Sequence, residues 1–154
     1  MAHAYRDDFP LLNNLDIAYL DNAATDDYEN AREAVRAFLN AKSAREIIFT
    51  RNTTEGLNLV AYSYGLSHVK AGDEVLVSIL EHHSNLLPWQ MVCRQTGATL
   101  KFMECEPDGS LDLNKVEALI TDKTKLVACT QVSNVIGRIN PSARSRTWPT
   151  GTAR

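Results

Sequence analysis

Three short segments of this chain carry side chains that could hold a phosphorylated aromatic molecule. They are Arg51-Asn52-Thr53-Thr54-Glu55-Gly56, Glu81-His82-His83-Ser84-Asn85 and Val132-Ser133-Asn134-Val135-Ile136-Gly137. Their hydroxyl, imidazole and amide groups occur where predicted strands end. Because ligands of an open α/β sheet bind beyond the carboxyl ends of its strands, these segments predict a binding site at one edge of a sheet.

Thr53 and Thr54 stand at the start of a predicted helix. Backbone N–H groups at a helix start are unpaired and carry the positive end of the helix dipole, so they suit a phosphate. The two hydroxyls add further donors. The alternative is local capping, because Asn52 followed three residues later by Glu55 is typical of a capping box. From the hexapeptide in isolation, capping is the commoner explanation.

His82, His83 and Asn134 have similar alternatives. A neutral imidazole at a strand end could stack on an aromatic ring or transfer a proton near neutral pH. A His pair more often consists of one buried and one exposed residue, and no Cys, His or Asp set at metal-ligand spacing accompanies this one. The Asn134 amide could donate to a phenolate oxygen, or it could brace a turn before Gly137.

Alternating strand and helix patterns must position these residues. Strands are predicted over 17–20, 47–50, 74–80, 99–103 and 125–130, and helices over 26–41, 53–64, 86–95 and 113–120. We expect Gly65 and Gly97 to end two of the helices. The rhythm predicts an α/β fold, a mainly parallel sheet with helices on both faces.

Composition narrows the class of protein. The chain has 154 residues, 44% of them hydrophobic, and a net charge of −3, which is ordinary for a globular protein and does not suggest nucleic acid or an anionic membrane as partner. The N-terminus has no apolar signal region, and no apolar run approaches the length of a membrane span. Three cysteines without CxxC spacing indicate a reduced, cytosolic protein.

The sequence after Pro141 has a different character. Residues 142–154 show no hydrophobic periodicity, so we predict disorder there. The predicted organisation is an N-terminal segment 1–25, a main domain 26–141 and the tail 142–154.

Four motifs together resemble the pyridoxal-phosphate (PLP) enzymes of aminotransferase class V, and among them the SUF-type cysteine desulfurases. The motifs are Asp21-Asn22-Ala23-Ala24-Thr25, Ile48-Phe49-Thr50-Arg51-Asn52-Thr53-Thr54-Glu55, Glu81-His82-His83-Ser84-Asn85-Leu86-Leu87-Pro88-Trp89-Gln90 and Val132-Ser133-Asn134-Val135-Ile136-Gly137. The resemblance implies that residues 26–141 are the truncated, PLP-binding large domain of a fold-type I PLP transferase. Enzymes of this family pass sulfur from L-cysteine to an enzyme persulfide, leave alanine and serve iron–sulfur cluster assembly. Because the family continues with a helix after the position of Pro141, we interpret the tail 142–154 as the product of a shifted reading frame. A related family uses selenocysteine.

The resemblance also implies roles for individual residues. Thr53 and Thr54 would contact the PLP phosphate, His82 would stack on the ring and assist proton transfer, and Asn134 would bond near the phenolic oxygen. It further implies a homodimer and a sulfur-acceptor protein as partners.

Several departures from the family pattern bear on activity. A helix and a His-Arg-Gly loop that follow Thr25 in the family are missing, Asn52 replaces the usual Gly, and Gln131 replaces the usual His. The family's Schiff-base lysine and nucleophilic cysteine do not occur in these residues, and the sequence around Cys93, Cys105 and Cys129 does not match that of the family's nucleophile. The sequence therefore predicts an inactive N-terminal fragment of a desulfurase, with a non-catalytic PLP- or phosphate-binding module, or a partner of a full-length homologue, as the alternative.

Overall fold

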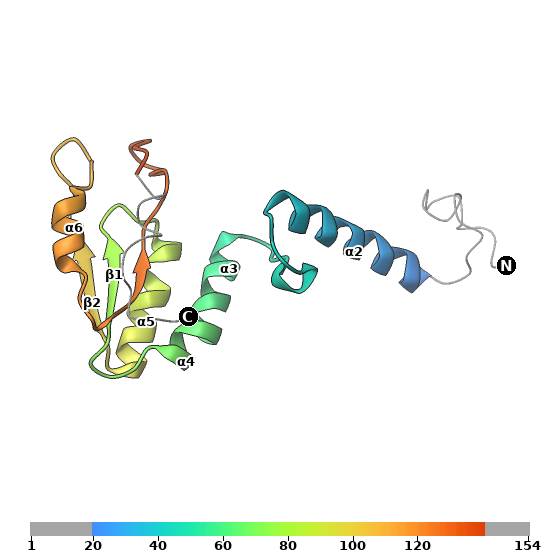
Figure 1. Ribbon diagram of the computed structural model, residues 1–154, viewed down its shortest axis with the longest axis horizontal. Coiled ribbons are helices and arrows are strands. Elements are labelled where there is room, and N and C mark those ends of the chain that lie inside the picture. The colour runs from blue at the N-terminus through green and yellow to red at the C-terminus, as the bar shows by residue number, and fades with distance from the viewer. Residues whose placement is uncertain (1–19, 141–154) are drawn as a thin grey trace. The chain divides into compact units, whose positions relative to one another are not determined.

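The computed structural model describes the backbone of residues 20–140 and the side chains of residues 26–140 (Figure 1). The chain divides into two compact units, Met1–Phe49 and Thr50–Arg154. The predicted strand residues 17–19 and the predicted disordered tail 142–154 lie outside the described residues.

In the first unit, helix α2 spans Leu20–Phe38 and a short 3₁₀ helix spans Ala44–Glu46. The prediction that this helix starts at Asp26 was wrong, since it extends back through the position of the expected deletion. No Gly or Pro interrupts the stretch, and adding residues to an existing helix is easy once its nucleus has formed. The helix ends before Asn40, whose φ of 53° is left-handed, a common helix stop.

The predicted strand over 47–50 does not form. These residues belong to no helix or strand, and Ile48 is 66% exposed. A strand is stable only in a hydrogen-bonded ladder, and no described strand pairs with this segment. Thr53 and Thr54 therefore follow an irregular segment and not a strand end.

The second unit is built on a parallel sheet of three described strands. They are β1 (Glu74–Ser78), β2 (Thr99–Met103) and β3 (Thr124–Ala128), in the order β2-β1-β3. Both neighbouring pairs are parallel, which confirms the predicted sheet. Strand β1 ends at Ser78, two residues earlier than predicted, because the Ser78 hydroxyl accepts a bond from the Leu80 N–H in the following turn.

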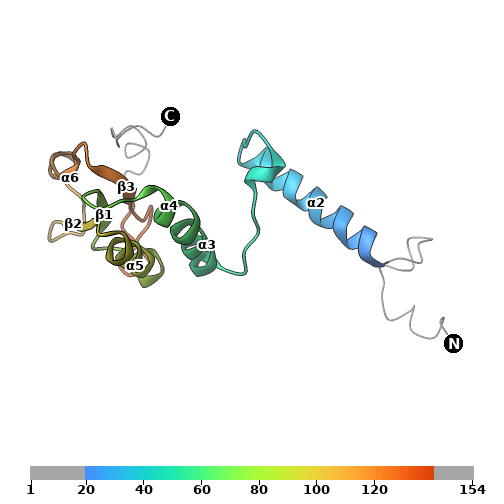
Figure 2. The same cartoon turned by 90° about the horizontal axis from the view of Figure 1, so that it is seen from below.

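Helices cover both faces of this sheet, as predicted. Figures 1 and 2 show α5 (Leu87–Thr96) and α6 (Leu113–Leu119) on opposite sides of it. Val75 and Val77 of β1 pack in one buried cluster with Trp89 and Val92 of α5. Leu76 points the other way and packs with Val116 of α6 and with other apolar side chains. Side chains alternate along a strand, so β1 is buried on both faces.

The helix that begins at Thr53 is longer than predicted. It runs through α3 (Thr53–Val60), a π-helical turn (Ala61–Gly65) and α4 (Leu66–His68), so Gly65 does not end it. Gly65 instead allows close packing on α5, since a Cβ there would lie 2.9 Å from Cγ2 of Val92. The expectation for Gly97 is confirmed, because it caps α5 with a φ of 77°.

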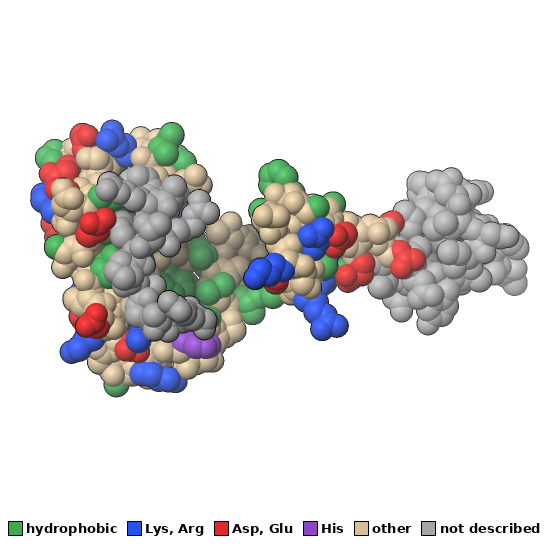
Figure 3. Space-filling view, viewed as in Figure 1, with side chains coloured by type: hydrophobic (Ala, Val, Ile, Leu, Met, Phe, Trp, Pro, Cys, Tyr) green, Lys and Arg blue, Asp and Glu red, His purple; other side chains and the backbone are tan. Residues whose placement is uncertain are grey.

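In the part of the chain that the structure describes, no helix has the length and apolar character needed to cross a bilayer. On the face shown in Figure 3, acidic and basic side chains are mixed along α6 and along α2.

Candidate functional site

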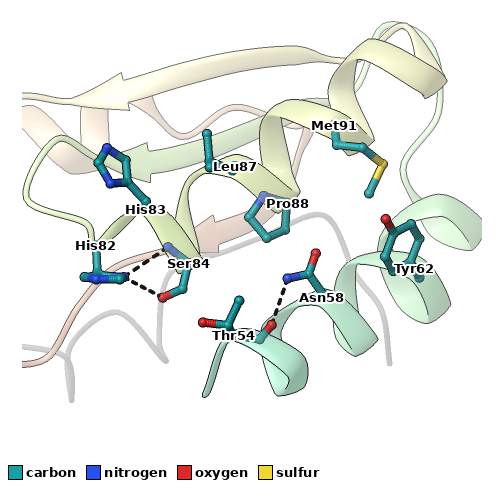
Figure 4. A pocket seen from close by; sticks show the side chains of 9 residues that line it. All are labelled: Thr54, Asn58, Tyr62, His82, His83, Ser84, Leu87, Pro88 and Met91. Carbon is teal, nitrogen blue, oxygen red and sulfur yellow. Dashed lines mark hydrogen bonds between the residues drawn. The ribbon is translucent and has the colours of Figure 1, made fainter. Parts of the chain in front are cut away.

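A pocket of about 450 Å³ lies between α3 and the segment that runs from His82 into α5 (Figure 4). This volume falls within the usual range for small-molecule sites. The described residues that line it include no carboxylate: Thr54, Asn58, Tyr62, His82, His83, Ser84, Leu87, Pro88 and Met91. The pocket has a polar end at Thr54, His82 and Ser84, and an apolar wall that α5 mostly supplies.

The start of α3 has hydrogen-bond donors that the helix cap does not use. The Asn52 side chain accepts the Glu55 N–H at 2.9 Å, so the capping interpretation is confirmed for that group. Among the described residues, the backbone N–H groups and hydroxyls of Thr53 and Thr54 donate to no other protein group. Capping thus leaves the first two N–H groups free for an anion.

Glu55 does not complete a reciprocal capping box. Its carboxylate accepts from the Arg51 backbone N–H at 2.7 Å and from the Arg51 side chain at 3.1 Å. These hydrogen bonds from Arg51 lower the pKa of Glu55. The negative charge at this helix start is therefore already paired with a neighbouring cation.

His82 is held by a short local contact. Its Nδ1 accepts the Ser84 N–H at 3.1 Å and lies 2.9 Å from the Ser84 hydroxyl. Because a backbone N–H can only donate, Nδ1 carries the lone pair, and in the neutral ring Nε2 carries the hydrogen. The exposed ring at the pocket edge (Figure 4) thus offers a π face and an N–H donor.

The histidine pair differs from the common pattern considered above. Neither His82 nor His83 is buried, and their ring centroids lie 6.2 Å apart. His83 begins a 3₁₀ turn, His83–Asn85, and also lines the pocket. Among the described residues, no group of three His, Cys, Asp or Glu side chains could hold a metal ion.

Asn134 lies in the turn that precedes Gly137, whose φ is 66°. The residue thus lies in a turn, as expected, but the turn is braced by the Ser133 hydroxyl, which accepts from the Val135 and Ile136 N–H groups. Within the described residues, the Asn134 amide itself makes no hydrogen bond. The Asn134 side chain is exposed and is not among those that line the pocket, and Gln131 is also exposed. Of the four predicted site residues, the structure brings Thr54 and His82 to one cavity. Thr53 does not line this cavity but directly precedes Thr54, at the start of α3.

Two of the cysteines are poor nucleophiles. Burial, together with the charge of Glu81, raises the pKa of the Cys129 thiol to about 11, and burial raises the pKa of Cys93. Thiols with raised pKa values remain protonated at neutral pH and react slowly. This supports the interpretation that neither is the desulfurase nucleophile.

Sequence reasoning missed most of the pocket wall. Asn58 and Tyr62 follow Thr54 at intervals of four, which places all three on one face of the helix. That spacing was readable in the sequence. The apolar contribution of α5, from Leu87, Pro88 and Met91, depends on how the two helices pack.

Comparison with known proteins gives a consistent result. The family model for aminotransferase class V matches residues 7–146. A probable cysteine desulfurase of Synechocystis sp. is 41% identical over 180 residues, covering 92% of this chain and 43% of the relative. A probable cysteine desulfurase of Halalkalibacterium halodurans is 52% identical over 122 residues, covering 79% and 30%. The Synechocystis alignment is longer than this chain, so the relative has residues without a counterpart here.

Solved structures agree with the sequence comparisons. The cysteine desulfurase CsdA of Escherichia coli superimposes with a TM-score of 0.75 at 37% identity, covering 86% of this chain and 34% of that one. A cysteine desulfurase of Thermococcus onnurineus NA1 gives 0.76 at 38% identity, covering 87% and 34%. The chain thus spans less than half the length of each of these relatives. With a family model matched over most of its residues and the desulfurase fold reproduced in part, this chain belongs to the PLP-dependent aminotransferase class V family.

Proposed function

We propose that this chain forms part of the PLP site of a cysteine desulfurase-like protein, and that the pocket between α3 and α5 receives the cofactor. The observation that carries the proposal is the convergence of Thr54 and His82 on one cavity of suitable size. The carboxylate-free lining favours an anionic ligand, since no negative charge in it opposes a phosphate.

The residues present fit the phosphate and one face of the ring. Thr53 and Thr54 supply free hydroxyl and N–H donors at the positive end of α3, and these would hold the phosphate. His82 presents an imidazole whose Nδ1 is fixed by Ser84, so the ring plane is set before a ligand binds. Apolar contacts from Leu87, Pro88 and Met91 exclude water along one side.

The proposed substrate is L-cysteine, whose sulfur the family transfers for iron–sulfur cluster assembly. PLP supplies an electron sink for such chemistry. In this chain His82 would move protons near the ring, through the Nε2 hydrogen that its tautomer provides. The family's Lys and Cys segments do not occur in these 154 residues, so we propose that the chain alone binds the cofactor without releasing sulfur.

A titration with PLP in phosphate-free buffer, followed by absorbance and calorimetry, tests the proposal. The double variant Thr53→Ala/Thr54→Ala should bind at least about tenfold more weakly, because hydrogen bonds to charged groups contribute about 1.5–3 kcal/mol each. Thr99→Ala is the matched control, since Thr99 is an exposed Thr that begins β2. Its affinity for PLP should equal that of the wild type.

Sulfide release from L-cysteine is measured on the same preparations. Binding of PLP without sulfide supports the proposal as stated. Sulfide release that depends on Thr53 and Thr54 would overturn the claim that the chain is inactive alone. Absence of PLP binding, or equal binding by the double variant, would overturn the placement of the cofactor.

A further inference from the structure

The carboxylate of Glu81 accepts hydrogen bonds from three segments at the carboxyl edge of the sheet. Its Oε1 accepts from the Ser78 hydroxyl at 2.7 Å and from the Thr130 backbone N–H at 2.6 Å. Its Oε2 accepts from Nδ2 of Asn85 at 2.6 Å. The donors come from the end of β1, from the segment after β3 and from the turn before α5. One side chain therefore ties all three together.

The network continues into the core. Oδ1 of Asn85 accepts from Nε1 of Trp89 at 3.0 Å, and Trp89 is buried against Val75 and Val77. The Trp89 bond fixes which way the Asn85 amide points, with its NH₂ group toward Glu81. Position 81 therefore requires a side chain with two acceptor oxygens, because each oxygen of Glu81 accepts from at least one donor.

His82 lies inside the loop that this network closes. The Asn85 N–H donates to the His82 carbonyl at 2.8 Å, while the Asn85 side chain donates to Glu81. The same turn presents the Ser84 N–H to Nδ1 of His82. Glu81 makes no direct bond to the imidazole, so any effect on it passes through the backbone of residues 81–85.

From this arrangement we infer that Glu81 is a positioning residue that sets the orientation and tautomer of the His82 imidazole. The inference rests on the proposed function for the use of that imidazole, and extends it to a residue outside the pocket lining. A carboxylate is needed because Gln at this position would turn an NH₂ group toward a donor. Rotating the Asn85 amide would remove that clash, but it would leave the buried Trp89 N–H without its acceptor.

Nitrogen NMR of the imidazoles, without PLP and at pH 8, tests the inference. His68 serves as an internal reference, because its Nδ1 lies 3.0 Å from the Tyr64 carbonyl oxygen and must donate. The wild type should show opposite tautomers, with the hydrogen on Nε2 in His82 and on Nδ1 in His68. In Glu81→Gln, we expect the two His82 nitrogen shifts to move toward their average, while those of His68 stay unchanged.

Glu106→Gln is the matched control, since it removes a carboxylate that pairs with Lys115 and has no bond to residues 81–85. Its His82 shifts should equal those of the wild type. Unchanged His82 shifts in a folded Glu81→Gln variant, with helix content verified by circular dichroism, would overturn the inference. If Glu81→Gln does not fold, the same His82 shifts are measured in Glu81→Asp, because the shorter Asp side chain cannot reach all three donors.

PLP titration then separates this inference from the proposed function. If both hold, Glu81→Gln should weaken PLP binding by about tenfold, by analogy with residues that orient metal ligands, whose replacement has at least this effect on affinity. A shifted His82 signature with no PLP binding in the wild type would contradict the proposed function and leave the positioning role standing. PLP binding with an unchanged signature would contradict the positioning role alone.

Discussion

The backbone N–H of Thr130 lies 2.6 Å from Oε1 of Glu81, a residue 49 positions earlier in the chain. The contact joins the segment after β3 to the turn after β1. It also brings a negative charge close to Cys129, which directly precedes Thr130, and contributes to the raised pKa of that thiol.

Cys129 should resist alkylation in the folded protein. With a pKa of about 11, caused first by burial and then by Glu81, its thiol is almost entirely protonated at pH 7.5, and the thiolate is the reactive form. Mass spectrometry after brief iodoacetamide treatment should find Cys129 and the buried Cys93 largely unmodified. In concentrated urea both should react fully, and equal rates in the two conditions would contradict the assignment.

Glu74 makes stability depend on pH in the acid range. Hydrogen bonds from Lys101, at 2.8 Å, and Thr121, at 2.7 Å, lower the pKa of Glu74 below its ordinary 4.5. A carboxyl group with a lowered pKa in the folded state contributes stability that is fully present above 4.5 and is lost as the pH falls below it.

Urea denaturation at pH values from 6 to 3 checks this expectation. The free energy of unfolding of the wild type should fall below pH 4.5, and Glu74→Gln should be less stable at pH 6 and show a shallower fall. Glu104→Gln changes an exposed carboxylate that follows β2, at the opposite end of the sheet from Glu74, and should keep the wild-type slope. Parallel curves for the wild type and Glu74→Gln would refute the role of Glu74.

Gly65→Ala should destabilise the second unit by about 1 kcal/mol or more. The added methyl would lie 2.9 Å from Cγ2 of Val92, which is fully buried and β-branched, so neither side chain has room to move. Gly56→Ala is the matched control in α3, where the new Cβ meets only Thr50 Oγ1 at 3.4 Å. That change should stabilise by about 0.5–1 kcal/mol. Thermal melts followed by circular dichroism measure both, and a Gly65→Ala variant as stable as Gly56→Ala would exclude tight packing here.

Leu76→Ala should cost about 2–5 kcal/mol, the usual range for removing a large buried aliphatic side chain. Leu76 has no exposed surface and packs against Met103 and Val116. Leu59→Ala removes the same atoms from a side chain that is 41% exposed and should cost much less. Equal losses in urea denaturation would mean that the face of the sheet beneath α6 is not a packed core.

The elements that were predicted correctly have strong local signals. Strand β2 was predicted with both of its ends, because Thr99–Met103 lies between Gly97 at a helix end and a Pro-Asp-Gly turn. The failures at 47–50 and at the start of α2 have a common cause. A strand needs a neighbouring strand to pair with, and the extent of a helix depends on the residues that flank it. Neither can therefore be predicted from a few consecutive residues.

The sequence alone determined the family, the parallel α/β sheet and the chemical groups at Thr53, Thr54 and His82, because motifs and periodicity are local properties of the chain. The tertiary structure decided which of these groups share a cavity, because that depends on how the helix that begins with α3 packs against α5 through Gly65 in its π-helical turn. It also decided that Glu81, in sequence merely the neighbour of a histidine pair, joins the end of β1, the segment after β3 and the turn before α5. Partly buried donors need acceptors, and the Glu81 carboxylate supplies them here. Only folding brings Ser78, Asn85 and Thr130 to the same carboxylate.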